Sequence, residues 1–182
     1  MRKYSIRELT LAAMLAAVYA ALTMGLPVPQ YGAVQIRFAE ALTVLPFLFP
    51  VATPGLFVGC LIANLMSPYG PLDVVAGSAA TLIACMWTQR LGSRHLAPLP
   101  PVVCNAVVIG CVIAFFEAGD GAAFLPAYAF NAATVGLGEL VACYLLGLPL
   151  LTVLPRIPFF REMIPAERLN RLQARPEYSN QG

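Results

Sequence analysis

Apolar runs long enough to cross a bilayer, separated by short polar breaks, follow one another through most of this chain. A helix needs about 20 apolar residues to cross the hydrocarbon core of a membrane. Only 11% of the 182 residues are charged, whereas soluble domains carry roughly 25%. This composition cannot provide a water-facing surface, so it excludes a soluble enzyme, a nucleic-acid binder and a disordered chain. It predicts an all-α membrane protein.

Prolines, glycines and polar residues divide the apolar sequence into six expected spans, of which the second and third are short. Six spans use about 120 residues, which leaves no room for a folded domain outside the membrane. The sequence therefore predicts a compact six-transmembrane-helix bundle in residues 1–155 and a polar cytoplasmic tail in residues 156–182, with a short helix near Ala166–Ala174. The expected spans are Ile6–Leu26, Arg37–Phe49, Gly55–Met66, Leu72–Gln89, Pro100–Glu117 and Ala127–Leu154, the last kinked at Pro149.

The N-terminus starts with two basic residues before an apolar run, as a secretory signal does. Ser5 and Glu8 instead fit a capping box, which begins a helix by satisfying its free amides. The run from Leu9 to Leu26, which Pro27 and Pro29 are expected to end, is long enough for a true span. We therefore interpret this segment as the first span.

The basic residues predict the orientation. With the N-terminus inside, ten of the eleven Lys and Arg residues fall on the cytoplasmic side, as the positive-inside rule requires. Both termini are therefore expected in the cytoplasm, and the expected location is the plasma membrane. Arg37 is the exception, because it is expected on the outer side at the mouth of the second span.

Ionisable and amide side chains inside the expected spans are the candidate site residues, because such groups are costly in a bilayer. Most are expected near the outer side, whereas Glu139 lies about 12 residues into the sixth span, or roughly 18 Å, close to the midplane. They predict a polar cup open to the outside, with Glu139 as its floor. The candidates are Arg37, Glu40, Asn64, Asp73, Asn105, Asn131 and Glu139.

Each candidate also has a structural interpretation. Arg37 and Glu40 are three residues apart, so they can pair at the membrane interface. Asp73 can cap the helix that it opens, and the asparagines can hydrogen-bond between helices. Glu139 needs a partner from another helix, or a proton. The sequence leaves these alternatives open.

Alanines repeat every four residues on two faces of the first expected span. Small residues at this spacing allow another helix to approach closely. These faces either pack inside the bundle or dock a partner membrane protein. The alanines predicted to dock are Ala12, Ala13, Ala16, Ala17 and Ala20.

No catalytic motif stands out. The sequence has no H-E-x-x-H, G-x-S-x-G or Walker motif, and its five cysteines and one histidine have no metal-ligand spacing. No catalytic residue, metal, cofactor or nucleic-acid partner is therefore predicted. The chain either works passively, uses an ion gradient, or borrows ATP hydrolysis from a partner.

Five stretches of the sequence are similar to one transporter family. They are Ile36–Pro46, Gly59–Asn64, Asp73–Thr81, Pro100–Ala106 and Val135–Glu139. With them, the segment from Ser5 to Pro155 resembles the QueT family of queuosine-precursor transporters, which are substrate-capture (S) components of energy-coupling factor (ECF) transporters.

The resemblance implies a substrate-binding domain in residues 1–155. It would capture a 7-deazaguanine such as preQ0, preQ1 or queuine from outside and deliver it with a membrane scaffold (T) component and two ATP-binding subunits, which implies no enzymatic activity of its own. The alanine faces would contact the T component. The resemblance carries over six site residues: Arg37, Glu40, Asn64, Asp73, Asn105 and Glu139.

The chemistry of a 7-deazaguanine is compatible with these residues. Its N1–H and exocyclic amine are adjacent donors, and one carboxylate such as Glu139 can accept both. Its O6 needs a donor, which Arg37 or an asparagine can supply, and a cationic aminomethyl group would suit Glu40 or Asp73. A flat ring can stack on an aromatic side chain at a loop or helix edge. The aromatic candidates are Tyr31, Tyr69, Phe116, Phe124 and Tyr128.

Three other functions stay open from the sequence. The first is a stand-alone facilitator or proton-coupled carrier of a small vitamin-like molecule, with Glu139 as the proton site. The second is an intramembrane enzyme that uses Glu139 and Asp73 as an acid pair. The third is a structural subunit without a ligand.

The predicted orientation can be tested by cysteine labelling in intact cells. A membrane-impermeant thiol reagent should reach a cysteine placed at Gly121, in the loop expected outside, and miss one placed at Ser93, in the basic loop expected inside. The reverse pattern would contradict the topology and the outward-facing cup.

Overall fold

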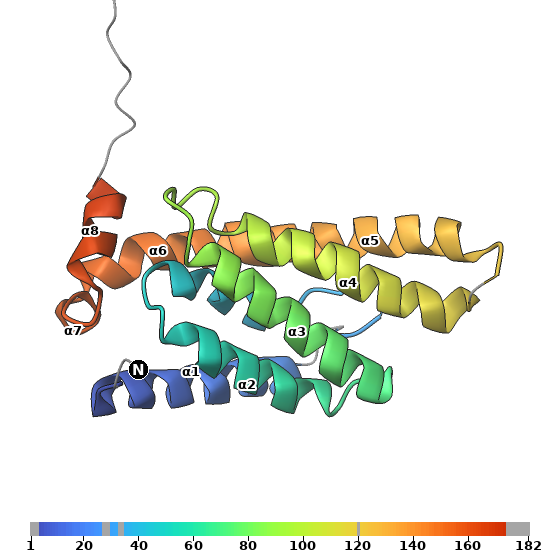
Figure 1. Ribbon diagram of the computed structural model, residues 1–182, viewed down its shortest axis with the longest axis horizontal. Coiled ribbons are helices and arrows are strands. Elements are labelled where there is room, and N and C mark those ends of the chain that lie inside the picture. The colour runs from blue at the N-terminus through green and yellow to red at the C-terminus, as the bar shows by residue number, and fades with distance from the viewer. Residues whose placement is uncertain (1–3, 27–29, 33–34, 120, 174–182) are drawn as a thin grey trace, which may run out of the picture.

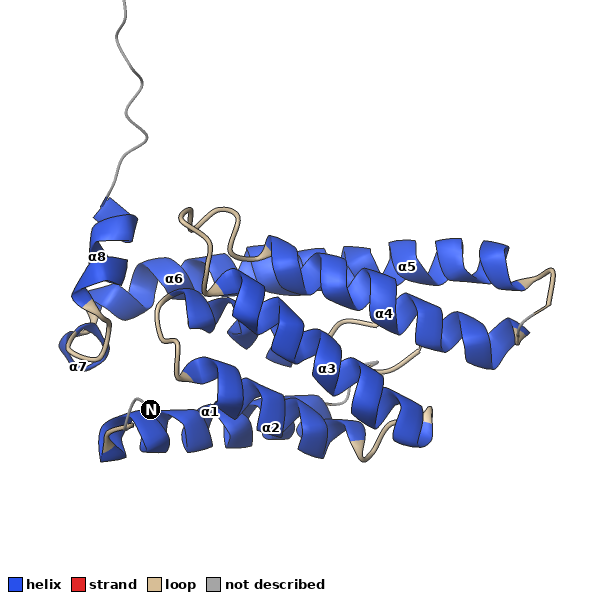
Figure 2. Ribbon diagram, in the orientation of Figure 1, coloured by secondary structure: helices blue, strands red, loops and turns tan. Residues whose placement is uncertain are grey.

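The computed structural model describes residues 4–26, 30–32, 35–119 and 121–173, and these residues form helices and connecting loops without a strand (Figure 2). This confirms the prediction of an all-α protein. The first helices are α1 (Ile6–Gly25), η1 (Phe38–Phe47), α2 (Ala52–Asn64), α3 (Gly70–Thr88), α4 (Leu99–Ala118) and α5 (Phe124–Leu140). The chain continues through η2 (Val141–Gly147), α6 (Leu148–Val153), η3 (Leu154–Arg156), α7 (Pro158–Arg161) and α8 (Ala166–Gln173).

Four segments are long and apolar enough to cross a membrane: α1, α3, α4 and the continuous stretch Phe124–Arg156. The expected second and third spans are present as the shorter apolar helices η1 and α2, with 10 and 13 residues. Each is about 20 Å long, less than the ~30 Å of a hydrocarbon core. The structure therefore supports a membrane helical bundle, while the count of six spans and the side of the termini stay predictions.

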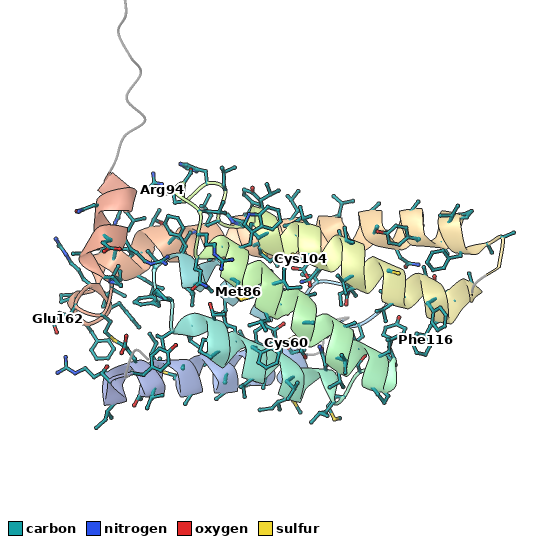
Figure 3. The ribbon with its side chains drawn as sticks, viewed as in Figure 1. Cys60, Met86, Arg94, Cys104, Phe116 and Glu162 are labelled. Carbon is teal, nitrogen blue, oxygen red and sulfur yellow. The ribbon has the colours of Figure 1, made fainter. Side chains whose placement is uncertain are left out.

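The two ends of the molecule differ in charge. The start of α1, the α3–α4 loop and α7–α8 lie at one end, and the α2–α3 and α4–α5 turns lie at the other (Figure 1). Figure 3 places Arg94 and Glu162 toward the first end and Phe116 at the second. The described basic residues other than Arg37 belong to elements at the first end, which agrees with the predicted sidedness. Arg2, Lys3 and Arg175 lie outside the described residues.

The start of α1 confirms the predicted capping box. Ser5 Oγ accepts from the Glu8 N–H at 3.2 Å, and Glu8 Oε2 accepts from the Ser5 N–H at 2.8 Å. The helix ends at Gly25, one residue before the expected end. Pro27 and Pro29, which were expected to end it, lie outside the described residues.

Alanines of α1 pack against glycines of α2. A Cβ added at Gly59 would lie 2.6 Å from the Ala16 carbonyl oxygen, and a Cβ at Gly55 would overlap the Ala12 carbonyl. The two helices therefore approach backbone to backbone, as small residues permit. Ala16 is buried in this contact, whereas Ala13 and Ala17 are exposed. One of the two predicted alanine faces is thus occupied by α2, and Ala13 and Ala17 on the other face are exposed.

η1 is a 3₁₀-helix in the interior of the bundle, and it packs against α1, α2, α3, α4, α6 and η2. Pro46 lies inside it and has no N–H to donate to the preceding turn, which disfavours an α-helix there. Two glycines let η1 and the residues before it approach the α5–η2 helix. A Cβ at Gly138 would overlap the Gln35 carbonyl, and one at Gly147 would lie 2.9 Å from the Ala41 carbonyl oxygen.

The long last helix is interrupted before Pro149, where a kink was expected. Residues Val141–Gly147 form a π-helical segment, and α6 then continues with Pro149 near its start. A proline inside a helix removes the N–H that its preceding turn needs, and a π-segment is one way to accommodate this. The helical stretch reaches Arg156, slightly beyond the expected Leu154.

Part of the predicted polar tail folds back on the bundle. α8 confirms the expected short helix. Ile164 is buried with the main core, and the Phe160 ring lies 6.3 Å from the Phe49 ring. Leu169 and Leu172 of α8 pack against the same core. Residues 156–173 are therefore partly apolar and packed, and residues 174–182 lie outside the described part.

The glycines of α2 should be intolerant of a methyl group. We expect Gly59→Ala to lower the free energy of unfolding by about 2 kcal/mol, because the new Cβ meets rigid backbone of α1. Gly92→Ala is the control, since no atom lies within 4 Å of a Cβ there. Thermal unfolding in detergent measures both, and equal midpoints would contradict the close α1–α2 contact.

Candidate substrate-binding site

The seven predicted site residues are all buried, with at most 3% of their surface exposed. Buried polar groups are costly unless they have hydrogen-bonding partners. The structure arranges the residues as two neighbouring clusters and one separate pair. The first cluster centres on Arg37, the second on Glu40 and Glu139, and the separate pair contains Asn131.

Arg37 holds the first cluster together. It is the residue before η1 and has an extended backbone. Its Nε donates to the Gln30 carbonyl at 2.9 Å, and its Nη2 donates to Asn64 Oδ1 at 3.2 Å. The same Nη2 lies 3.8 Å from Asp73 Oδ2, which forms a fully buried ion pair. The guanidinium also lies 4.8 Å from the centre of the Tyr31 ring, close enough for a cation–π contact.

α2 and α3 supply the anionic side of this cluster. Asn64 at the end of α2 donates from Nδ2 to the Asp73 carbonyl at 3.2 Å, which ties the two helices together. A Cβ at Gly77 would lie 2.7 Å from Asn64 Nδ2 and 2.8 Å from Asp73 Oδ1. A glycine is therefore needed one turn after Asp73 to leave room for both polar side chains.

The second cluster joins two carboxylates. The Tyr19 hydroxyl of α1 donates to the Glu40 carboxylate, and Asn105 Nδ2 of α4 donates to Glu139 Oε1 at 2.9 Å. Cys143 lies between them, with its Sγ 3.4 Å from the Glu40 carbonyl oxygen and 3.8 Å from Glu139 Oε2. Asn105 therefore does reach Glu139, the predicted floor of the cup, although it lies near the start of α4, the end expected on the inner side.

The structure corrects two structural interpretations of the sequence. Arg37 pairs with Asp73 rather than with Glu40, because the extended backbone at Arg37 removes it from the helical face of Glu40. Asp73 lies in the first turn of α3, where the helix dipole favours a carboxylate, but it makes no capping hydrogen bond. One of its oxygens faces Arg37 instead, and the other has no partner among the described residues.

Asn131 lies apart from both clusters. Its Nδ2 donates to Glu117 Oε2 at 2.6 Å and to the Ala127 carbonyl at 2.9 Å. It precedes Glu139 by eight residues on α5, which is roughly 12 Å along a helix. Glu117 is exposed but reaches this buried amide.

Several residues of the clusters were not predicted. Tyr19 is fully buried in α1, and a tyrosine in the middle of an alanine-rich span was the signal that could have identified it. Cys143 follows Glu139 by one helical turn, and this spacing was the signal that could have identified it. Gln30 is 5% exposed and lies in a loop, where no sequence pattern indicates burial.

Some buried polar atoms of the described residues have no hydrogen-bonding partner. Glu40 Oε2 and Asp73 Oδ1 are acceptors of this kind, and both amide atoms of Gln30 are also unpaired. The others are Thr53 Oγ1, Ser78 Oγ and Asn131 Oδ1. Such atoms are rare in folded proteins, because each costs free energy until a ligand or water satisfies it. The clusters can therefore accept hydrogen bonds from a small polar ligand.

The aromatic candidates occupy different places. Tyr31 donates its hydroxyl to the Ala63 carbonyl at 2.7 Å, and burial raises the pKa of this phenol, which keeps it a donor. Tyr69 contacts Phe116 with ring centres 5.3 Å apart, and Phe124 stacks on Tyr128 at 6.0 Å. Of the five, Tyr31 is the one in contact with Arg37.

The side chains of the two clusters are those of a hydrogen-bonding site. Among the described residues, no group of three or more His, Cys, Asp or Glu side chains is arranged to hold a metal ion. The polar atoms of the two clusters are instead carboxylate, amide, hydroxyl and guanidinium groups that suit hydrogen bonding.

Comparison with known proteins gives one family. The family model described as QueT transporter matches residues 9–156. A relative named Queuosine precursor transporter QueT, from Lactococcus lactis subsp. cremoris, is 33% identical over 85 residues, which cover 46% of this chain and 50% of the relative. The matched region thus spans about half of the relative's length. No solved structure is significantly similar to the chain.

The buried ion pair should matter more for stability than an exposed one. We expect Asp73→Asn to lower the free energy of unfolding by about 3 kcal/mol, because it leaves the Arg37 charge buried without its counter-ion. Glu162→Gln is the matched control, since the Arg7–Glu162 pair is 3.9 Å apart and largely exposed, and should change stability by less than about 1 kcal/mol. Thermal unfolding in detergent compares the two. Similar effects would show that the interior around Arg37 is well hydrated.

Proposed function

The chain belongs to the QueT transporter family, and on that premise we propose that it is the S component of an ECF-type importer. It captures a queuosine precursor, a 7-deazaguanine, from outside the cell. A T component and two ATP-binding subunits then complete its delivery. The family makes the chain a transporter with several membrane-embedded helices, and a transporter role is not an enzymatic one.

The observation that carries the substrate proposal is the set of unpaired acceptors in the buried clusters. Glu40 Oε2 and Asp73 Oδ1 have no donor among the described residues. The N1–H and exocyclic amine of a deazaguanine are adjacent donors, and charged acceptors form the stronger hydrogen bonds. Glu40 and Glu139 are the carboxylates that we propose for this edge of the ring, and the Cys143 thiol contacts both residues, at the Glu40 backbone carbonyl and at the Glu139 carboxylate.

The first cluster has donors for the opposite side of the ligand. Gln30 has a free amide nitrogen and oxygen, and its backbone carbonyl is bound by Arg37. The amide nitrogen of Gln30 is a donor and suits the O6 acceptor of a purine-like ring. Asn64 and Asp73 orient the guanidinium, and Asn105 orients Glu139. Asn131 lies nearer the α4–α5 turn, on the entry side of the proposed path.

The named relative supports the substrate class. Its printed name describes a queuosine precursor transporter, and it is 33% identical over 85 residues. Because those residues cover only half of the relative, the substrate of this chain stays a proposal. Which precursor is preferred depends on the group at position 7 of the ring, where an aminomethyl cation would suit the free Asp73 oxygen.

The proposed assembly rests on the sequence and on α1. The sequence contains no nucleotide-binding Walker motif, so ATP would have to be hydrolysed by a partner. Ala13 and Ala17 form an exposed small-residue face on α1, which suits close approach by a T component. Ala12 and Ala16 are engaged by α2, and Ala20 is partly buried, so the docking face that we propose consists of Ala13 and Ala17.

A second candidate function is a stand-alone facilitator or proton-coupled carrier. The burial of the Glu139 carboxylate among neutral partners, Asn105 and Cys143, favours it, because a carboxyl group in a low-dielectric interior readily holds a proton. Purified chain in liposomes separates the alternatives. Substrate uptake without any ATPase supports the carrier, whereas binding without uptake supports the S component.

Removal of one carboxylate should weaken binding strongly. We expect Glu139→Gln, and separately Glu40→Gln, to raise the Kd for 7-aminomethyl-7-deazaguanine about 30- to 1000-fold, since each replaces a charged acceptor with an amide whose nitrogen faces a ligand N–H. Glu162→Gln is the control, because Glu162 is exposed at the far end. Calorimetric titration in nanodiscs, beside a thermal-unfolding check, measures the effect. Near-native affinity in both folded variants would remove these carboxylates from the site.

A further inference from the structure

The C-terminal end of η1 has two carbonyl groups that the backbone does not satisfy in the usual way. The N–H of residue 50 would donate to the Pro46 carbonyl in an α-helix, or to the Phe47 carbonyl in a 3₁₀-helix. Residue 50 is a proline, which has no N–H. The Phe49 N–H donates to the Leu45 carbonyl instead. A buried helix end without donors is costly, so these carbonyls need a partner from elsewhere.

Arg168 of α8 supplies that partner. Its Nη1 donates to the Phe47 carbonyl at 2.6 Å and to the Pro46 carbonyl at 3.0 Å. These contacts join residues more than 120 positions apart in the sequence. A cation at the C-terminal end of a helix is also favoured by the helix dipole. One guanidinium of α8 therefore caps the C-terminal end of η1.

The position of Arg168 is itself fixed by packing. Ile164 is 4% exposed within the main core, and Leu169 and Leu172 of α8 contact the same core. Phe160 packs on Phe49, which follows η1 directly. α7 and α8 therefore form a folded unit on this end of the bundle, and Arg168 is held where η1 ends.

The opposite end of η1 carries the candidate site. Arg37 precedes the helix, and Glu40 lies in its first turn. A ten-residue 3₁₀-helix connects these residues to the carbonyls that Arg168 binds. We infer that Arg168 is a positioning residue: by anchoring the C-terminal end of η1 from α8, it holds Arg37 and Glu40 in register with Glu139 and Asp73. For substrate affinity, this inference rests on the proposed function.

The packing of η1 against η2 can be measured without a ligand. Cys143 Sγ contacts the Glu40 carbonyl, so its reaction with N-ethylmaleimide reports separation of η1 from η2. We expect Arg168→Gln to accelerate labelling of Cys143 about 10- to 100-fold, as loss of charged hydrogen bonds allows. Arg168→Lys should accelerate it less, because a lysine keeps the charge but not the fork of donors. Arg156→Gln, at an exposed arginine of η3, should leave the rate unchanged.

Labelling of each cysteine is read separately by peptide mass spectrometry. Cys111 is exposed and should react equally in every variant, and Cys85 is fully buried in α3 and reports general opening. Selective acceleration at Cys143 supports the inference. No acceleration overturns it, and so does equal acceleration at Cys85, because Arg168 would then stabilise the whole fold. If Arg168→Gln does not fold, the same comparison is made with Arg168→Lys.

A second arm measures the Kd for 7-aminomethyl-7-deazaguanine in nanodiscs. We expect Arg168→Gln to raise the Kd about 10-fold or more, with Arg168→Lys between it and the original chain. An unchanged Kd alongside faster Cys143 labelling overturns the link between α8 and the site. If the original chain binds no 7-deazaguanine, the proposed function fails, while the labelling arm still decides whether Arg168 positions η1.

Discussion

The burial of a guanidinium inside an apolar bundle is the constraint on which the rest of the site depends. A cation in a low-dielectric interior is tolerated only with a counter-ion and acceptors for its donors. Arg37 receives both from different helices: the carboxylate of Asp73 from α3, the amide oxygen of Asn64 from α2, and the carbonyl of Gln30 from the loop after α1. The requirements of one side chain therefore bring together segments that are distant in the sequence.

The second cluster follows the same rule with the opposite charge. Glu40 and Glu139 are carboxylates in an interior without water-exposed surface, and their described partners are neutral: Tyr19, Asn105 and Cys143. Each neutral donor occupies one lone pair of a carboxylate, so the carboxylate oxygens can accept further hydrogen bonds. Buried acceptor atoms therefore lack hydrogen-bond donors where a polar ligand would fit. In the first cluster, Gly77 leaves room for Asn64 and Asp73.

The sequence was informative where a single physical rule applied. The low charge and long apolar runs predicted an all-α membrane protein, and the cost of burying polar groups identified seven residues that are indeed buried. Pairing was less predictable, because it depends on backbone conformation. Arg37 and Glu40 would share a face of a helix that contained both, but Arg37 precedes η1 and has an extended backbone. The packing of residues 156–173 was also missed, since its apolar contacts are spread among charged residues and only the tertiary structure brings them to the core.

The 3₁₀ form of η1 has a mechanical consequence. Ten residues at a rise of about 2.0 Å span roughly 20 Å, whereas an α-helix of the same residues would span only about 15 Å. Pro46 opposes this contraction, because a proline there would clash with the preceding turn of an α-helix. The 3₁₀ form and Pro46 therefore set the separation between the Arg37 end and the Arg168 end of η1, and conversion to an α-helix would shorten that separation by roughly 5 Å.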